Sequence, residues 1–451
     1  MHALLTRPFL VYVCGFLILF YIHLLIPAVP VLILIAAFMI LISRNYFCFA
    51  LLNFFLGLTG FSPLLLIANG WPATIANAPI HAGAFILYFV LSFVFLRLTI
   101  SANRNHLNWF IIGTVFTVAM LPLKNFQFYR LFLTIACFNL WSLIFYMKSV
   151  RSREQLSLVD FSHNTLNFLM FTPIPPVTTN STSWKMNTQI ELTDEECLRI
   201  LKITLVNLAL LLFHQWIVDA SSYIRFLNQI ILPSEGIQSG FIFNHTLWLD
   251  EPIWMVWLIC IASCLYTFML IYLYFVPSVL LYQIMGFKLK LPAYNLLKSK
   301  SLYEFFENFN HYYNKIIVEA FAVPTLSLVK NKHKKQAIIP IFFFSIILCG
   351  FVYHYLRRPA LFLSSNTIES LYLFLSSTIY WVLLAAAACL SMVFERQQEL
   401  DGSRYRPLRW LCYLVINSAL LVWVMSYEIN KSTLTDRLKV FLKLFGLTWY
   451  E

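Results

Sequence analysis

Long apolar runs, separated by short polar or basic segments, recur from one end of the chain to the other. A run of about 20 apolar residues is long enough to cross the hydrocarbon core of a bilayer as an α-helix. On this pattern we predict roughly ten or eleven membrane spans. They lie near residues 8–28, 30–43, 47–68, 83–99, 109–122, 129–147, 199–218, 253–282, 337–356, 368–394 and 408–427.

The first apolar run and the segment 161–177 each allow an interpretation other than an ordinary span. The first run predicts a retained span and not a cleavable signal peptide, because it is too long and a second span follows it. The segment 161–177 is too short and too interrupted by proline for a full span, so we interpret it as a candidate re-entrant segment.

A third pattern occupies residues 283–336, which read neither as a clean span nor as a soluble domain. Its centre predicts an amphipathic helix whose apolar face follows a spacing of three and four residues: Leu302, Phe305, Phe306, Phe309, Tyr313, Ile316, Ile317 and Ala320. At about 100° per residue, Asn310 falls on the flank of that face and His311 nearly opposite it. We therefore expect Asn310 to border the packed interior, and His311 to lie on the polar side with Glu304 and Lys315. Such a helix is most often a surface-lying anchor.

The composition agrees with a membrane protein. Of the 451 residues 60% are hydrophobic, and the mean hydropathy is +0.75. Only 12% are charged, about half the share of a soluble domain, which argues against a water-soluble enzyme. The net charge of +12 would point to nucleic acid in a soluble protein. In a polytopic one it indicates basic cytoplasmic loops beside anionic lipid, so we expect membrane lipid and no nucleic acid as a partner.

The clearest orientation signal is the stretch KNKHKK at 330–335, which we expect on the cytoplasmic side of the membrane. Its lysines are Lys330, Lys332, Lys334 and Lys335. Their charge suits lipid headgroups, the phosphates of coenzyme A or an acidic carrier protein, so they are candidate donor-binding residues.

The nine cysteines are scattered, and no CxxC pair occurs. Cys260 and Cys264 share a helix face, but two thiols without histidine or further cysteine are more typical of packing than of a metal site. We predict no metal site.

Ionisable residues inside spans are functional candidates, because their burial in hydrocarbon costs free energy. His214 ends one span beside Asp219, where an interfacial or hydrogen-bonded role is expected. His354 lies near the end of the span that follows the lysines, 44 positions after Asn310. A re-entrant helix followed by a span would bring His354 and Asn310 together.

The segment from Gly286 to Leu326, GFKLKLPAYNLLKSKSLYEFFENFNHYYNKIIVEAFAVPTL, resembles the central segment of the membrane-bound O-acyltransferase (MBOAT) family. That family shows a Ser-x-x-Asp/Glu-Phe-Trp-x-x-Trp block followed by His or Asn. Ser301, Glu304 and Phe305 match it without a gap, with phenylalanine at both tryptophan positions. Pro324 lies fourteen residues beyond Asn310, as in the family. Glu307 and Asn308 replace the usual basic pair.

By this resemblance Asn310 occupies the first polar active-site position, and His311 is the alternative one residue out of register. His354 matches the family's histidine and is preceded by GFVY. Weaker likeness covers most of 161–451, and in length and layout the nearest branch acetylates alginate or D-alanylates teichoic acid. This sequence departs from the family pattern mainly in lacking the basic pair and the two tryptophans of the block.

The resemblance implies an all-α polytopic membrane protein with an MBOAT-like ring of tilted helices and re-entrant segments. Residues 1–160 would be N-terminal transmembrane helices, and residues 161–451 the catalytic core. The implied reaction moves an acyl group, with acetyl expected, from a cytoplasmic thioester to a hydroxyl of an exported glycan or lipid-linked acceptor. The donor, acyl-coenzyme A or an acyl carrier, is a co-substrate and not a bound cofactor. A periplasmic or membrane partner would pass the group on, at the bacterial inner membrane.

The chemistry expected of these residues follows from their side chains. A neutral imidazole can take the hydroxyl proton, which makes His354 the candidate general base. A carboxamide can polarise the thioester carbonyl, which is the role expected of Asn310. A transporter or flippase, or a catalytically inactive MBOAT-like protein, are the alternatives, although we find no internal repeat of the kind many transporters contain.

Overall fold

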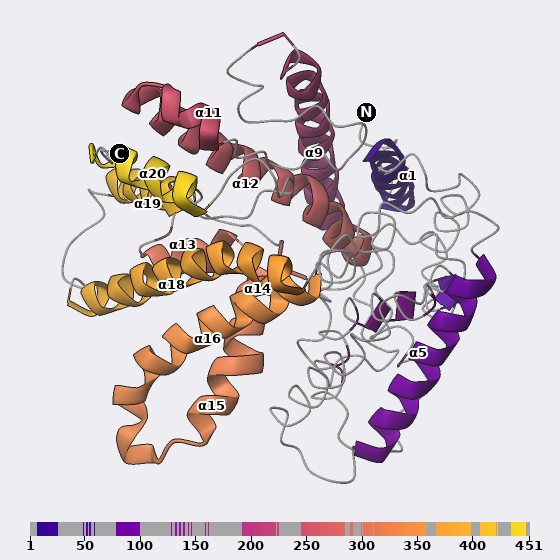
Figure 1. The fold of residues 1–451 in the computed structure, drawn as a ribbon. Coiled ribbons are helices and arrows are strands. Elements are labelled where there is room, and N and C mark those ends of the chain that lie inside the picture. Colours follow the sequence, from indigo (N-terminus) through magenta and orange to yellow (C-terminus); the bar gives the residue numbers. More distant parts are fainter. Residues whose placement is uncertain are drawn as a thin grey trace. The chain divides into compact units, whose positions relative to one another are not determined.

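A computed structural model describes the following parts of the chain: 7–25, 78–99, 192–221, 223–224, 245–284, 289–291, 299, 301–309, 311–357, 367–397, 406–420, 422 and 434–447, with single residues or pairs between 48 and 58 and between 128 and 161. The regular structure within these parts is helical, without strands (Figure 1). The elements are α1 (Arg7–Leu25), α5 (Ala78–Thr99), α9 (Asp194–Ser221), α11 (His245–Asp250), α12 (Ile253–Ile284), α13 (Leu302–Phe309), α14 (His311–Ile316), the π-helix η6 (Ile317–Ala322), α15 (Val323–Ser327), the 3-10 turn η7 (Asn331–His333), α16 (Lys334–Arg357), α18 (Thr367–Gln397), α19 (Arg406–Leu420) and α20 (Leu434–Leu444).

Four segments in the described part of the chain are long and apolar enough to cross a membrane. They are Pro79–Arg97, Asp194–Ala220, Ile253–Ile284 and Asn331–Gly350. Shorter apolar helices cover Leu10–Tyr21, Thr378–Val393 and Leu411–Leu420, within three further predicted spans. The predicted spans 30–43 and 109–122, and most of 47–68 and 129–147, lie outside the described residues. The chain is therefore an all-α membrane protein.

The start of α9 explains why this helix begins before the apolar run predicted at 199–218. Thr193 and Glu196 form a reciprocal capping box. The Glu196 N–H donates to Thr193 Oγ1 at 3.2 Å, and the Thr193 N–H donates to Glu196 Oε2 at 2.9 Å. Asp194, Glu195 and Glu196 lie in the first turn, where negative charge is favourable. The polar sequence TDEE thus starts the helix, and the apolar residues after it continue it.

The chain divides into two compact units, each assembled from separate stretches. The first comprises Met1–Ala209, Leu273–Leu291 and Leu356–Ser364, and the second comprises Leu210–Tyr272, Pro292–Tyr355 and Ser365–Glu451. Helices α9 and α12 contribute residues to both units.

Aromatic contacts dominate one core of the first unit. Phe161 is fully buried, and its ring centroid lies 5.1 Å from that of Phe89 and 5.3 Å from that of Phe93, both on α5. These pairs meet edge to face, the geometry that aromatic quadrupoles prefer. The Tyr21 hydroxyl of α1 donates to the Leu273 carbonyl at 2.7 Å, which ties α1 to the C-terminal part of α12.

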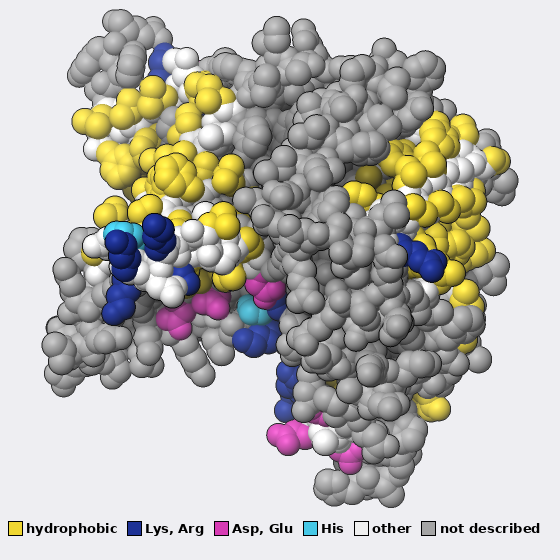
Figure 2. Space-filling view, turned by 90° about the horizontal axis from the view of Figure 1, so that it is seen from below, with side chains coloured by type: hydrophobic (Ala, Val, Ile, Leu, Met, Phe, Trp, Pro, Cys, Tyr) yellow, Lys and Arg dark blue, Asp and Glu magenta, His cyan; other side chains and the backbone are white. Residues whose placement is uncertain are grey.

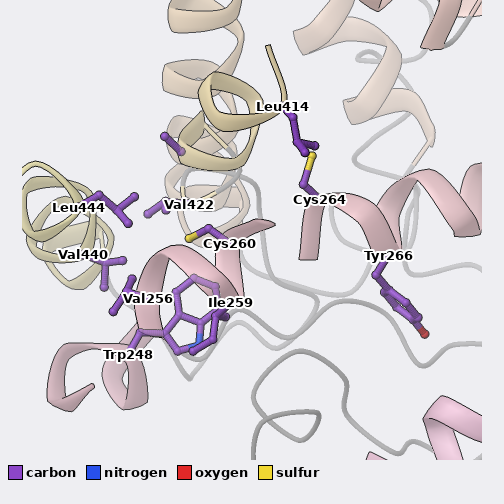
Figure 3. Close-up of a cluster of buried hydrophobic side chains, with 11 residues drawn as sticks. Trp248, Val256, Ile259, Cys260, Cys264, Tyr266, Leu414, Val422, Val440 and Leu444 are labelled. Atoms are coloured by element: carbon purple, nitrogen blue, oxygen red, sulfur yellow. The ribbon is translucent and has the colours of Figure 1, made fainter. Parts of the chain in front are cut away.

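In the second unit, a buried cluster joins α11, α12, α19 and α20 (Figure 3). Its members are Trp248, Val256, Ile259, Cys260, Cys264, Tyr266, Leu414, Ala419, Val422, Val440 and Leu444. Trp257 Nε1 donates to the Leu444 carbonyl at 2.9 Å, and Lys443 Nζ donates to the Leu249 carbonyl at 2.5 Å, so α20 is held against α11 and α12 by polar bonds as well. The presence of Cys260 and Cys264 in this cluster confirms their predicted packing role.

A carboxylate placed on the buried side of α20 should detach that helix. In Val440→Asp an unpaired charge replaces a fully buried side chain, and its desolvation costs several kcal/mol. We expect α20 to become much more sensitive to limited proteolysis in detergent. Thr435→Asp, at an exposed position of the same helix, is the matched control and should leave cleavage unchanged. Equal resistance of both variants would contradict this docking.

Candidate functional site

The start of α13 is held by two serines. Ser301 Oγ accepts from the Glu304 N–H at 3.0 Å, the bond expected of an N-cap. Ser391 Oγ of α18 accepts from the Tyr303 N–H at 3.3 Å. A helix start leaves such N–H groups without intrahelical acceptors, so both bonds stabilise α13. The Ser-x-x-Glu spacing seen in the sequence therefore has a structural explanation as a helix cap.

The apolar face predicted for residues 302–320 is confirmed at Leu302, Phe305, Ile316 and Ile317, which are all buried. Phe305 contacts Phe268 of α12, with ring centroids 5.8 Å apart, and Tyr413 of α19, at 6.2 Å. This segment is therefore packed against other helices of the second unit and is not a surface anchor.

The regular α-helical period predicted through Ala320 is wrong for its last turn. Residues Ile317–Ala322 form a π-helix, and the Val323 N–H bonds to the Val318 carbonyl, five residues earlier. Pro324 follows immediately and has no N–H to donate. The Thr325 hydroxyl donates to the Phe321 carbonyl at 2.7 Å, which satisfies a carbonyl close to the proline. The wider turn shifts the register of the side chains after Ile316.

The sequence did not predict that two asparagines of this segment, Asn308 and Asn314, are buried. Asn308 Nδ2 donates to Ser299 Oγ at 3.0 Å, and Asn314 Nδ2 donates to the Tyr303 hydroxyl at 3.3 Å. At about 100° per residue, both fall about 120° from the middle of the apolar face, on opposite sides of it. The sequence does show several asparagines close together in an apolar region. A helical wheel, however, cannot show which side of the helix other helices will cover.

His311 begins α14 and is half-buried, with its Nδ1 atom shielded from solvent. Glu304 and Lys315, expected with it on the polar side, are also half-buried. Lys315 pairs with Glu319 at 3.4 Å, one helical turn on. The polar side of this segment is thus partly covered by the fold.

Asn310 lies outside the described residues, and Tyr313, three positions later, lies within them. The Tyr313 ring of α14 packs against Trp381 of α18, with centroids 5.5 Å apart. This contact joins α14 to α18.

Trp381 reaches α16 at Gly350. A Cβ added to Gly350 would lie 2.3 Å from Cδ2 of the indole, so this close approach requires glycine. His354 belongs to the same helix, one turn beyond Gly350, and its side chain lies outside the described residues. The structure thus brings together the near neighbours of Asn310 and His354.

Further contacts hold these helices in register. The Tyr303 ring lies edge to face on Phe342 of α16, with centroids 5.0 Å apart. Cys389 Sγ of α18 donates to the Ile339 carbonyl of α16 at 3.8 Å. Segment α13–α14, α16 and α18 therefore form one packed region, which we call the Trp381 junction (Figure 1).

The other predicted residues lie elsewhere in the second unit. His214 is buried on α9, and its Nδ1 lies 3.0 Å from the Tyr266 hydroxyl, which confirms the expected hydrogen-bonded histidine. Lys330, Lys332 and Lys335 are exposed and Lys334 is half-exposed at the connection between α15 and α16.

No family model matches this sequence, and a search of curated proteins finds no match. The fold and the Trp381 junction define the class of the protein as an all-α membrane protein with a tightly packed interhelical region.

Gly350→Ala should destabilise the protein by about 1–3 kcal/mol, because its methyl group overlaps the Trp381 ring. We expect a lower Tm in detergent. The effect should be smaller for Gly83→Ala on α5, where the added Cβ would lie 3.2 Å from the Phe128 ring.

The direct contact can be isolated with a double-mutant cycle. Trp381→Leu removes the indole, so Gly350→Ala should cost clearly less in that background than in the wild type. Additive losses would show that the two residues do not constrain each other.

Proposed function

We propose that this chain is a membrane-bound O-acyltransferase of the MBOAT type. It would transfer an acyl group, expected to be acetyl, from a cytoplasmic thioester to a hydroxyl of an exported glycan or lipid-linked acceptor, at the bacterial inner membrane. The observation that carries the proposal is that Trp381 contacts both Tyr313 of α14 and Gly350 of α16.

Chain geometry limits how far the two candidate catalytic residues lie from this contact. Three residues span at most about 11 Å between Cα atoms, which bounds the separation of Asn310 from Tyr313. In α16, His354 lies about 6 Å along the helix axis from Gly350 and on the same face. These bounds are compatible with the proposed chemistry, in which Asn310 and His354 would act close to Trp381.

The reaction requires a base, a donor for the oxyanion and exclusion of water. His354 would take the proton of the acceptor hydroxyl, whose oxygen attacks the thioester carbonyl carbon. The Asn310 carboxamide would donate a hydrogen bond to the oxyanion that develops there. As the C–S bond breaks, the thiolate leaves and takes the proton from the imidazolium. Buried Trp381 and Cys349 make the adjoining interior apolar, which strengthens such polar interactions.

No serine or cysteine nucleophile is needed for this direct transfer. The thioester is consumed as a co-substrate, and a membrane or periplasmic partner would receive the acyl group or pass it on. The alternative assignment places the donor role on His311, whose shielded Nδ1 shows that this position is partly enclosed.

His354→Ala should lower the rate of acyl transfer by about 10²–10⁴-fold, because the general base is lost. The assay is release of free thiol from an acyl thioester, together with labelling of the acceptor, by protein in proteoliposomes. His214→Gln changes a buried histidine at another site and should retain activity. Both variants must unfold at a Tm close to that of the wild type.

Two results would contradict the proposal. Full transfer by His354→Ala would exclude its role as the base, and no transfer by the wild type with any thioester tested would favour an inactive MBOAT-like protein. If a substrate crosses the vesicle membrane equally well in the wild type and in His354→Ala, without transfer, a transporter or flippase is the better reading.

Asn310→Ala should lower the rate by about 10²–10³-fold, the usual cost of losing an oxyanion donor. His311→Ala should retain most of the activity in the same assay. The reverse order of effects would move the polarising role to His311.

A further inference from the structure

The connection between α15 and α16 carries a cluster of positive charges. We call residues 330–335 the basic tip. The exposed residues of this segment are Lys330, Lys332, His333 and Lys335. The segment contains a short 3-10 turn, in which the His333 N–H donates to the Lys330 carbonyl at 2.9 Å. The sequence contains no aspartate or glutamate between Glu319 and Glu369, so no acidic residue lies close to these charges along the chain. Figure 2 shows groups of lysine or arginine and histidine side chains, dark blue and cyan, on one face, with aspartate or glutamate side chains, magenta, near them.

Apolar side chains are exposed just before the basic tip. Leu328 is 68% exposed and Val323 is 54% exposed. The membrane-crossing segment Asn331–Gly350 begins within the tip itself. The lysines therefore lie at the end of an apolar span, the level at which lipid headgroups meet the hydrocarbon. Lysine stems can follow apolar surface there while the ammonium groups reach phosphate.

We propose that the basic tip binds the phosphate groups of anionic phospholipids, with Leu328 contacting the adjoining acyl chains. A soluble phosphate compound, such as the coenzyme A donor, would account for the lysines but not for the exposed apolar side chains of Leu328 and Val323 beside them. A lipid satisfies both kinds of side chain. This inference does not depend on the proposed acyl transfer.

Lipid binding can be measured directly on the full chain. The detergent-solubilised protein is titrated with phosphatidylglycerol or phosphatidylcholine, and bound lipid is counted by native mass spectrometry. The wild type should retain phosphatidylglycerol preferentially. Lys330→Gln/Lys332→Gln/Lys335→Gln should lower that retention by at least about tenfold, since each lysine contributes to attraction of anionic lipid.

A matched control removes three exposed positive charges from other membrane helices. Arg97→Gln, Arg199→Gln and Lys202→Gln, combined in one protein, change net charge by the same amount on α5 and α9. This variant should keep the preference for phosphatidylglycerol. If it loses as much lipid as the tip variant, net charge alone explains the binding and the proposed site is overturned.

Two further arms distinguish lipid from free phosphate. Coenzyme A and inorganic pyrophosphate should not displace phosphatidylglycerol at equal concentration, and displacement by either would assign the tip to a soluble phosphate compound. Leu328→Gln should reduce phosphatidylglycerol retention several-fold, and unchanged retention would overturn the proposed acyl-chain contact. Equal retention of both lipids by the wild type would overturn the proposal as a whole.

Discussion

The close approach of Gly350 to the Trp381 indole is the constraint on which the candidate site depends. Because Gly350 has no side chain, the backbone of α16 can lie in van der Waals contact with the Trp381 indole of α18. The same ring system also packs against Tyr313, so one tryptophan contacts both α14 and α16. The positions of side chains near Tyr313 on α14 and near Gly350 on α16 therefore depend on these contacts with Trp381.

Polar side chains within this apolar protein are used to connect helices. His214 bonds to Tyr266 across α9 and α12, and Asn417 Nδ2 donates to Cys264 Sγ across α19 and α12 at 3.2 Å. Within the Trp381 junction, Ser391 of α18 accepts from the first turn of α13. In an interior of low polarity an unsatisfied polar group is costly, so each such bond favours one arrangement of the helices over others.

The π-helix at Ile317–Ala322 shows where local rules stop predicting geometry. Pro324 indicates that the hydrogen-bond ladder must be interrupted nearby, and Thr325 offers a side-chain donor. Neither residue alone dictates that the change takes the form of a wider turn instead of a kink. Ile317 and Phe321 in this turn are buried, so the π-helix also takes part in tertiary packing, which a local rule does not describe.

The sequence by itself determined the all-α membrane class, the long apolar helices that the described residues include, and the apolar face of α13 and α14. The N-caps at Thr193 and Ser301 are equally local features, although neither was predicted from the sequence. These features arise from periodicity, apolar length and hydrogen bonds between residues close along the chain, so they can be predicted locally. Only the tertiary structure decided that Tyr313, Gly350 and Trp381 meet, that Asn308 and Asn314 are buried, and that the polar side of α14 is half-covered. Those facts depend on contacts between residues far apart in the chain, and no local pattern encodes which helix will cover which flank.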